Sequence, residues 1–195
     1  MVTNTVRIGI AGTASTGKTT LLRRIEMELR SEGITVARTG GLGKRAREIG
    51  FQKMAGHTAA STEWVITQGI ADELAGTVHA DVVLADRAAH DALAYYLAAL
   101  ELRQEEPDPA TLERLNRLVD TQKYDVLFAT VLDPDCTVVK KHDYDPVYRQ
   151  LVDRHLHQLL NERGIGHFLV TNEDVSRDEA TILARGAAGI PAGVA

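Results

Sequence analysis

The sequence predicts an α/β protein in which a parallel sheet lies between layers of helices. Three observations support this class. Short apolar runs alternate with longer segments of helical spacing. Residues 81–85 are almost continuously apolar, as expected of a central parallel strand. A glycine-rich loop joins the first apolar run directly to a helical segment. The 195 residues suit a single compact domain, which we expect to cover residues 1–195.

The N-terminal part of the chain predicts two strands and a helix. Residues 6–11 are an apolar run that ends at a glycine, which is typical of a buried strand. Residues 18–30 place their apolar side chains on one helical face, and Gly33 ends this helix. Residues 34–38 are the second expected strand, and a flexible glycine-rich loop follows at 40–43.

The middle of the chain continues the alternation. A helix is expected to begin with Ser61 as its N-cap, because the apolar residues after it repeat every four positions. Residues 81–85 form the third expected strand. Helices are expected at 88–102 and 110–122, separated by a polar turn with two prolines.

The C-terminal part of the chain supplies the last two strands. Residues 124–132 are the fourth expected strand, and the charged stretch 133–145 after it is irregular. A long helix is expected at 146–163, with a proline near its first turn. A fifth strand at 166–170 and a helix at 177–185 complete the pattern.

Composition excludes several classes of protein. Lys plus Arg is 22 and Asp plus Glu is 27, a net charge of −5, which does not suit a general nucleic-acid coat. The single cysteine, Cys136, permits neither an intramolecular disulfide nor a cysteine-based zinc site. No apolar run reaches the roughly 18 residues of a membrane helix, and the N-terminus does not resemble a signal peptide. We expect a cytoplasmic protein without a membrane partner.

The loop after the first strand fits the pattern G-x-x-x-x-G-K-S/T in every fixed position. Backbone N–H groups of such a loop surround a phosphate, and the next helix adds its positive dipole. Lys18 can reach the β- and γ-phosphates, Thr19 can bind Mg²⁺, and Thr20 is a weaker contact near the α-phosphate. The pattern therefore predicts ATP and Mg²⁺ as ligands, the alternative being a chance glycine-rich turn. The nucleotide-binding residues expected in the loop are Gly12, Ala14, Ser15, Thr16 and Gly17.

Asp86 ends the third strand, where its carboxylate can hold Mg²⁺ through water, the acceptor hydroxyl, or both. The alternative is a residue that caps the next helix. Arg87 comes directly afterwards and cannot act as a base, but it can bind phosphate, which favours phosphoryl transfer over hydrolysis. Alternatively, Arg87 forms an ion pair with Asp91 on the helix surface. A guanine-binding N-K-x-D signature is missing at residues 171–174, which argues against a small GTPase.

The segment from Asp86 reads D-R-x-x-x-D-x-L-A-Y and, with the phosphate loop, resembles the nicotinamide riboside kinase family of P-loop kinases. The resemblance implies a three-layer fold with a five-stranded parallel sheet in the order 2-3-1-4-5. It also implies ATP as the phosphoryl donor and a mobile lid at 133–149. Related enzymes often carry an acidic residue and an arginine after the second strand, whereas this chain has Lys44, Arg45 and Arg47. These cations suit an anionic acceptor such as a nucleoside monophosphate, the alternative being a solvated helix face.

The resemblance also suggests further binding residues. Gln68 would form paired hydrogen bonds with a base and Trp64 would stack on it, whereas the alternative is a surface glutamine and a core tryptophan. Lys53 and His57 are weaker candidates near the acceptor. Asp91 is expected to contact the acceptor.

Cations of the expected lid would close over the donor phosphates and exclude water, the alternative being a charged surface loop. Lys140 and Lys141 lie in this loop, and Arg149 projects from the helix after it. Asn172 and Arg177 occupy the position where similar enzymes flank adenine.

The sequence as a whole predicts a kinase that transfers the γ-phosphoryl group of ATP to a small nucleoside- or nucleotide-like acceptor. Catalysis would use Lys18, Asp86 and Arg87. Two alternatives remain open. One is a kinase that acts on nucleic acid, in which Lys44, Arg45 and Arg47 would bind the strand. The other is a regulatory module that binds or hydrolyses ATP without an acceptor.

Overall fold

The computed structural model describes residues 5–133, 135 and 145–190. Five parallel strands form one sheet in the order β2-β3-β1-β4-β5, which confirms the order implied by the family resemblance. The strands are β1 (Val6–Ala11), β2 (Val36–Thr39), β3 (Val82–Asp86), β4 (Val126–Thr130) and β5 (Phe168–Val170).

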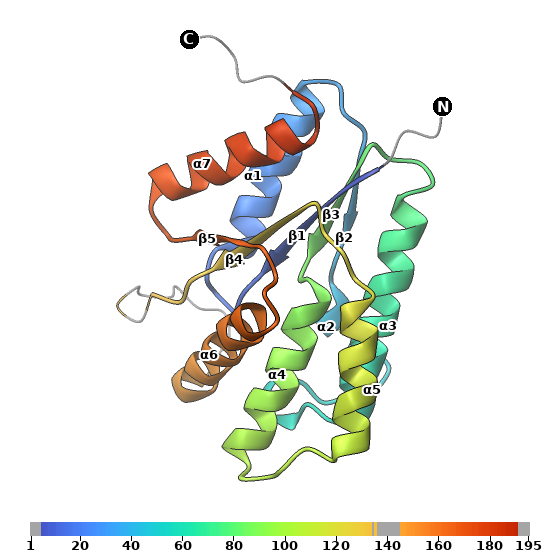
Figure 1. Ribbon diagram of the computed structural model, residues 1–195, viewed down its shortest axis with the longest axis vertical. Helices are drawn as coiled ribbons and strands as arrows, with labels where there is room; N and C mark the ends of the chain where they lie inside the picture. The colour runs from blue at the N-terminus through green and yellow to red at the C-terminus, as the bar shows by residue number, and fades with distance from the viewer. Residues whose placement is uncertain (1–4, 134, 136–144, 191–195) are drawn as a thin grey trace.

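Helices cover both faces of the sheet and make the predicted three layers (Figure 1). One face packs against α1 (Lys18–Ser31) and α7 (Asp174–Ala187). The opposite layer contains α3 (Ala59–Gly76), α4 (Ala89–Leu102), α5 (Pro109–Asp120) and α6 (Pro146–Glu162). The short helix α2 (Leu42–Glu48) and a 3₁₀ turn, η1 (Met54–Gly56), follow β2.

Side chains alternate between the two faces of each strand, so the core has one part on each side of the sheet. Ile8 and Ile10 of β1 are fully buried against α1, where they meet Leu22. On the other face, Leu127 and Ala129 of β4 pack with residues of α4 and α6. Because successive side chains of a strand point to opposite faces, a central strand is apolar at nearly every position.

The structure corrects three expected boundaries. The helix predicted from Ser61 begins at Ala59, and Thr58 is its N-cap, because its hydroxyl accepts the Ser61 N–H at 3.2 Å. Ser61 is instead the third residue of a capping box. The second strand begins at Val36 rather than at residue 34, and the last helix begins at Asp174 rather than at residue 177.

The helix α2 replaces the second half of the flexible loop expected at 40–43. Gly41 supplies a left-handed N-cap with φ of +70°, which turns the chain into the helix. Leu42 and Ala46, four residues apart, bury the same face of α2. This helix matters for the site because it carries Lys44, Arg45 and Arg47, which together form a basic patch.

No helix in the described ranges combines the length and apolar character needed to cross a membrane.

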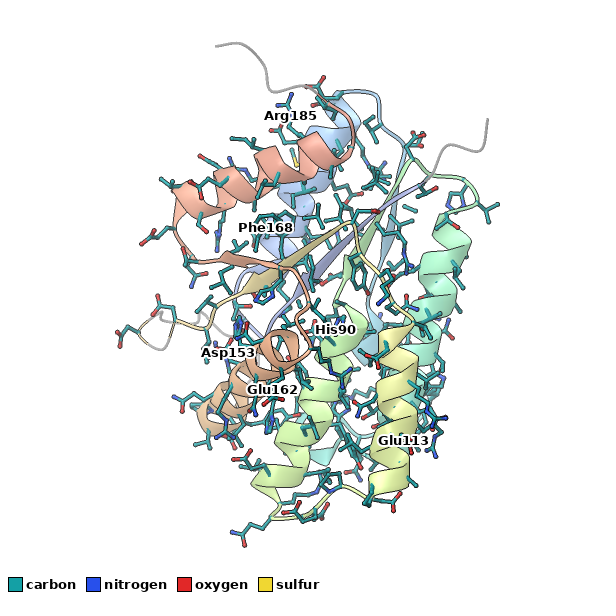
Figure 2. All side chains as sticks on the ribbon, in the orientation of Figure 1. His90, Glu113, Asp153, Glu162, Phe168 and Arg185 are labelled. Atoms are coloured by element: carbon teal, nitrogen blue, oxygen red, sulfur yellow. The ribbon has the colours of Figure 1, made fainter. Side chains whose placement is uncertain are left out.

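Buried histidine makes the stability of the fold sensitive to acid. His90 lies in α4 (Figure 2). It is 3% exposed, and its ring centroid lies 6.3 Å from that of Tyr124. Burial, assisted by the Arg163 cation, lowers the pKa of His90 to about 4. Between pH 6.5 and 4 the unfolded chain therefore binds a proton that the folded chain does not. Stability is lost as the pH falls through this window.

We expect His90 to account for about 2 kcal/mol of the stability lost between pH 7.5 and pH 5. Urea unfolding at the two pH values measures this loss, and the variant His90→Leu should show a shallower dependence. An unchanged pH dependence in His90→Leu would contradict the assignment.

Candidate phosphoryl-transfer site

The phosphate loop at 12–19 joins the end of β1 to α1 and turns through three positive φ angles. These are +147° at Gly12, +62° at Ser15 and +83° at Gly17. Gly17 directly precedes α1, and no side chain caps the first turn of this helix. The N–H groups of that turn are therefore available to an anion, and the helix dipole adds positive potential.

The start of the loop is held from two sides. The Thr130 hydroxyl donates to the carbonyl oxygen of Ala11 at 3.1 Å and lies 2.6 Å from the Thr16 hydroxyl. The Asp91 carboxylate accepts the Gly12 N–H at 2.8 Å. A Cβ atom at Gly12 would lie only 1.9 Å from the Thr130 hydroxyl oxygen. The first residue of the loop must therefore be glycine.

Lys18 is buried beneath the loop and donates to the carbonyl oxygen of Thr13. Burial, together with the nearby Arg87 guanidinium, lowers the pKa of Lys18 to about 7. The carboxylates of Asp91 and Asp86 oppose this change. A polyphosphate beside Lys18 would favour its protonated form in the same way.

Two arginines from the C-terminal helices reach the loop from its other side. Arg149 in α6 is buried and donates its Nε–H to the carbonyl oxygen of Ala14 at 3.0 Å. Arg177 in α7 donates to the side-chain oxygen of Asn172 at 3.0 Å. A Cβ atom at Gly17 would lie 2.5 Å from the Arg177 Nη2, so the guanidinium lies directly on the loop. Arg149, Asn172 and Arg177, all predicted from the sequence, thus meet at the loop. Their contacts with a nucleotide stay predictions.

The other two predicted lid cations, Lys140 and Lys141, lie outside the described residues. The same holds for Cys136 and for most of the lid expected at 133–149. Arg149 is the one expected lid cation that the structure describes, and it already contacts the loop.

A cleft of about 750 Å³ opens beside the phosphate loop. Its walls come from the loop and the start of α1, from α2, η1 and α3, and from the junction of β3 with α4. The expected nucleotide side and the expected acceptor side therefore share one cavity. The residues singled out from the sequence that line it are Ala14, Ser15, Gly17, Lys18, Thr19, Thr20, Lys44, Arg47, Lys53, His57, Asp86, Arg87 and Asp91.

Asp86 ends β3, which lies next to β1 in the sheet. Its carboxylate accepts a hydrogen bond from Arg38 Nη2 at 3.2 Å. Asp86 and the exposed Thr19 border the same cleft, so their oxygens could hold Mg²⁺, which commonly takes few ligands from the protein. Within the described ranges, no group of three or more His, Cys, Asp or Glu side chains forms a metal site of its own.

Arg87 adopts a left-handed backbone with φ of +85°, and its N–H donates to the carbonyl oxygen of Ile10 at 3.1 Å. Its guanidinium carbon lies 4.8 Å from the centroid of the Tyr95 ring. Tyr95 raises the pKa of Arg87, so this side chain is a permanent cation in the cleft. The helix-surface ion pair with Asp91 does not form: Asp91 is 1% exposed and so is not on the surface, and Arg87 lies over Tyr95 instead.

The basic patch on α2 divides in two. Lys44 and Arg47 border the cleft, whereas Arg45 lies outside its lining and pairs with Asp72 of α3. Lys53, just before η1, also borders the cleft. Lys44 is itself 82% exposed and pairs with Glu48 at 3.6 Å, and Arg47 is exposed, so their binding of an acceptor stays a prediction beside the solvated-face alternative.

Cations crowd one another on this side of the cleft. Burial lowers the pKa of Lys53, and the nearby Arg47 and Arg87 lower it further. Burial and the Arg87 charge also lower the pKa of His57, to about 4, so that its imidazole is neutral near pH 7. None of Arg47, Lys53 and Arg87 has an ion-pair partner among the described residues.

Trp64 and Gln68 lie outside the lining of the cleft. The Trp64 ring packs beside Phe51, with ring centroids 6.0 Å apart, and Gln68 donates to Asp72 at 2.7 Å. Their binding of a base stays a prediction. The α3 side chains that do border the cleft are mainly small or apolar: Val65, Ile66, Gly69 and Ile70, with Glu73 beyond them.

Thr130, Tyr95 and Arg38 support the site but have no role assigned from the sequence. Tyr95 supports Arg87, and the spacing of four between residues 87, 91 and 95 is a signal that could have identified it. Arg38 holds Asp86, but no sequence pattern links these distant residues.

A model of the family described as an AAA domain matches residues 7–177 of the chain. No curated protein matches this chain. Among solved structures, "NadR protein in complex with NAD and AMP-PNP" is similar, with a TM-score of 0.71 and 15% identity. The match covers 98% of this chain and 51% of that one, so the chain spans about half the length of NadR.

Two kinases are similar over nearly their whole length. Thymidylate kinase from Ehrlichia chaffeensis has a TM-score of 0.63 and 16% identity, covering 92% of this chain and 98% of that one. Deoxyadenosine kinase from M. mycoides has a TM-score of 0.67 and 12% identity, covering 95% and 100%. At these identities the likeness shows the fold, which is that of P-loop nucleoside and nucleotide kinases.

Proposed function

The chain belongs to the AAA domain family, and from this membership and the cleft we propose that it is an ATP-dependent kinase. It transfers the γ-phosphoryl group of ATP to a small nucleoside- or nucleotide-like acceptor. The observation that carries this proposal is Arg87, a permanent cation in the cleft directly after Asp86. A guanidinium binds a phosphoryl group but cannot activate water, so the arrangement favours transfer over hydrolysis.

The chain's own residues would divide the work of the reaction. The backbone of the phosphate loop binds the donor phosphates, and Lys18 and Arg87 neutralise charge as it develops on the transferred group. Asp86 orients the acceptor oxygen and takes its proton where the acceptor is a hydroxyl. That oxygen forms the new bond to phosphorus, and the bond between the γ-phosphorus and ADP breaks. Thr19 and Asp86 would hold Mg²⁺, whose chemistry is to neutralise the β- and γ-phosphate oxygens.

The acceptor itself is proposed to be anionic, with a nucleoside monophosphate as the favoured class. Arg47 and Lys53 support this choice, because both border the cleft and neither has an ion-pair partner among the described residues. Arginine and lysine without carboxylate partners are suited to binding a phosphate. The apolar wall of α3 would face the uncharged part of the acceptor.

A product-detected transfer assay with Mg·ATP tests this function. Acceptors would include nucleosides, their monophosphates, nicotinamide riboside and a short oligonucleotide. A monophosphate as the strongly favoured acceptor is the expected result. Preference for the oligonucleotide, with strong salt dependence, would indicate a nucleic-acid kinase. ATP hydrolysis that no acceptor accelerates would indicate a regulatory module.

The division of the basic patch predicts different effects for two neighbouring arginines. Arg47→Ala should raise the KM for a monophosphate acceptor about ten-fold or more, since a charge-assisted phosphate contact is lost. Its KM for ATP should change little. Arg45→Ala is the matched control, because Arg45 pairs with Asp72 outside the cleft lining, and it should leave both constants nearly unchanged. Equal effects of the two variants on acceptor KM would refute the predicted role of Arg47.

A further inference from the structure

One oxygen of a buried carboxylate at the site has no hydrogen-bond partner. Asp91 lies in the first turn of α4 and is 1% exposed. Its Oδ1 accepts the Gly12 N–H at 2.8 Å. Its Oδ2 is buried and accepts no hydrogen bond from any described residue. Buried polar atoms are nearly always paired, so this oxygen calls for a physical explanation.

The charges around Asp91 supply that explanation. Burial raises the pKa of Asp91 to about 6, while Lys18 and Arg87 act in the opposite direction. Asp86 is the like charge nearby and adds to the increase. Neither cation forms an ion pair with Asp91 among the described residues, since Lys18 donates to Thr13 and Arg87 lies over Tyr95. The negative charge of Asp91 therefore compensates the positive charge of two cations with which it forms no ion pair.

We propose that Asp91 is a positioning residue with two separable roles, a hydrogen bond and a charge. Its Oδ1 fixes the first amide of the phosphate loop. The negative charge of the carboxylate as a whole lets Lys18 and Arg87 share the cleft before a nucleotide binds. This inference rests on the proposed kinase function.

A consequence follows for nucleotide affinity. Bound phosphates are attracted to Lys18 and Arg87, as the Asp91 carboxylate is. The phosphates and the Asp91 carboxylate also repel one another across the cleft. Asp91 thus weakens nucleotide binding while it orders the empty site. The same repulsion speeds the release of ADP, a step that often limits turnover in enzymes with closing lids.

Two substitutions separate the roles. Asp91→Asn keeps an oxygen for the Gly12 N–H but removes the charge. It should bind Mg·ADP and inorganic tripolyphosphate about ten-fold more tightly than the unaltered chain at a pH between the pKa values of Asp91 and Lys18, where both groups are mainly charged, with lower KM for ATP and lower kcat. Asp91→Ala also removes the acceptor of the Gly12 N–H. It should bind both ligands at least about ten-fold more weakly than Asp91→Asn.

Calorimetry measures the affinities, and Asp125→Asn is the matched control. Asp125 accepts the Arg7 N–H at 2.7 Å outside the lining of the cleft, so its replacement should not change nucleotide affinity. Weaker or unchanged binding by Asp91→Asn overturns the proposal, as do equal affinities of the two Asp91 variants. If Asp91→Ala does not fold, the comparison of Asp91→Asn with the unaltered chain still decides. An unaltered chain that binds neither ligand overturns the kinase function and this inference together. Normal turnover with the wrong variant pattern overturns the inference alone.

Discussion

Replacing Lys18 by alanine should abolish phosphoryl transfer and leave the chain folded. Lys18 belongs to the phosphate loop, and its amine is held there because it donates to the Thr13 carbonyl oxygen. Removing a positioned cation from such a site typically costs orders of magnitude in rate, and we expect kcat to fall at least about 10³-fold. The fold should survive because burial of the amine is itself unfavourable, as its lowered pKa shows.

Transfer assays and thermal melting measure the two parts of this prediction. Lys123→Ala is the control, because Lys123 is exposed and lies outside the cleft lining, and it should retain activity. Near-full turnover by Lys18→Ala would show that the interpretation of the phosphate loop is wrong.

Replacing Gly12 by alanine should both destabilise the chain and abolish nucleotide binding. The φ of +147° at Gly12 is accessible in practice only to glycine, and a Cβ would lie 1.9 Å from the Thr130 hydroxyl oxygen. Thr130 cannot move freely, because it is buried and donates to Ala11. Backbone strain and overpacking together should cost about 3 kcal/mol or more of unfolding free energy.

Denaturant unfolding and nucleotide titration measure both effects. Gly186→Ala is the contrasting control. Gly186 lies within α7 and a Cβ there meets no atom within 4 Å. This variant should be more stable than the unaltered chain by about 0.5–1 kcal/mol, because alanine favours helix. The double variant with Gly12→Ala and Thr130→Ala should recover part of the lost stability. If Gly12→Ala alone unfolds like the unaltered chain, the loop does not have the conformation described here.

The sheet could be predicted from the sequence because its information is local. An apolar run such as β1, a glycine-rich loop and the amphipathic start of α1 follow one another within a short segment. The helix α2 escaped prediction because three nearby glycines indicate a flexible loop. Only the four-residue spacing of Leu42 and Ala46 marks it, and that signal is brief.

The acceptor side could be predicted only in outline, because it depends on how helices are rotated about their axes. The spacing of Arg45 and Arg47 places them on different faces of a helix but does not say which face meets the cleft. The rotation of α3 likewise decides that Ile66 and Gly69, rather than Gln68, border the cavity. Contacts such as that of Arg38 with Asp86 join strands that are adjacent only in the folded sheet.

The contacts that complete the phosphate loop also set an order of events during synthesis. The loop is made before these partners, since Thr130 is 119 residues from the Ala11 carbonyl that it binds and Arg149 is 135 residues from Ala14. While a ribosome is still making the second half of the chain, the loop lacks these partners. We therefore expect the loop to reach its final conformation only after β4 and α6 have been made.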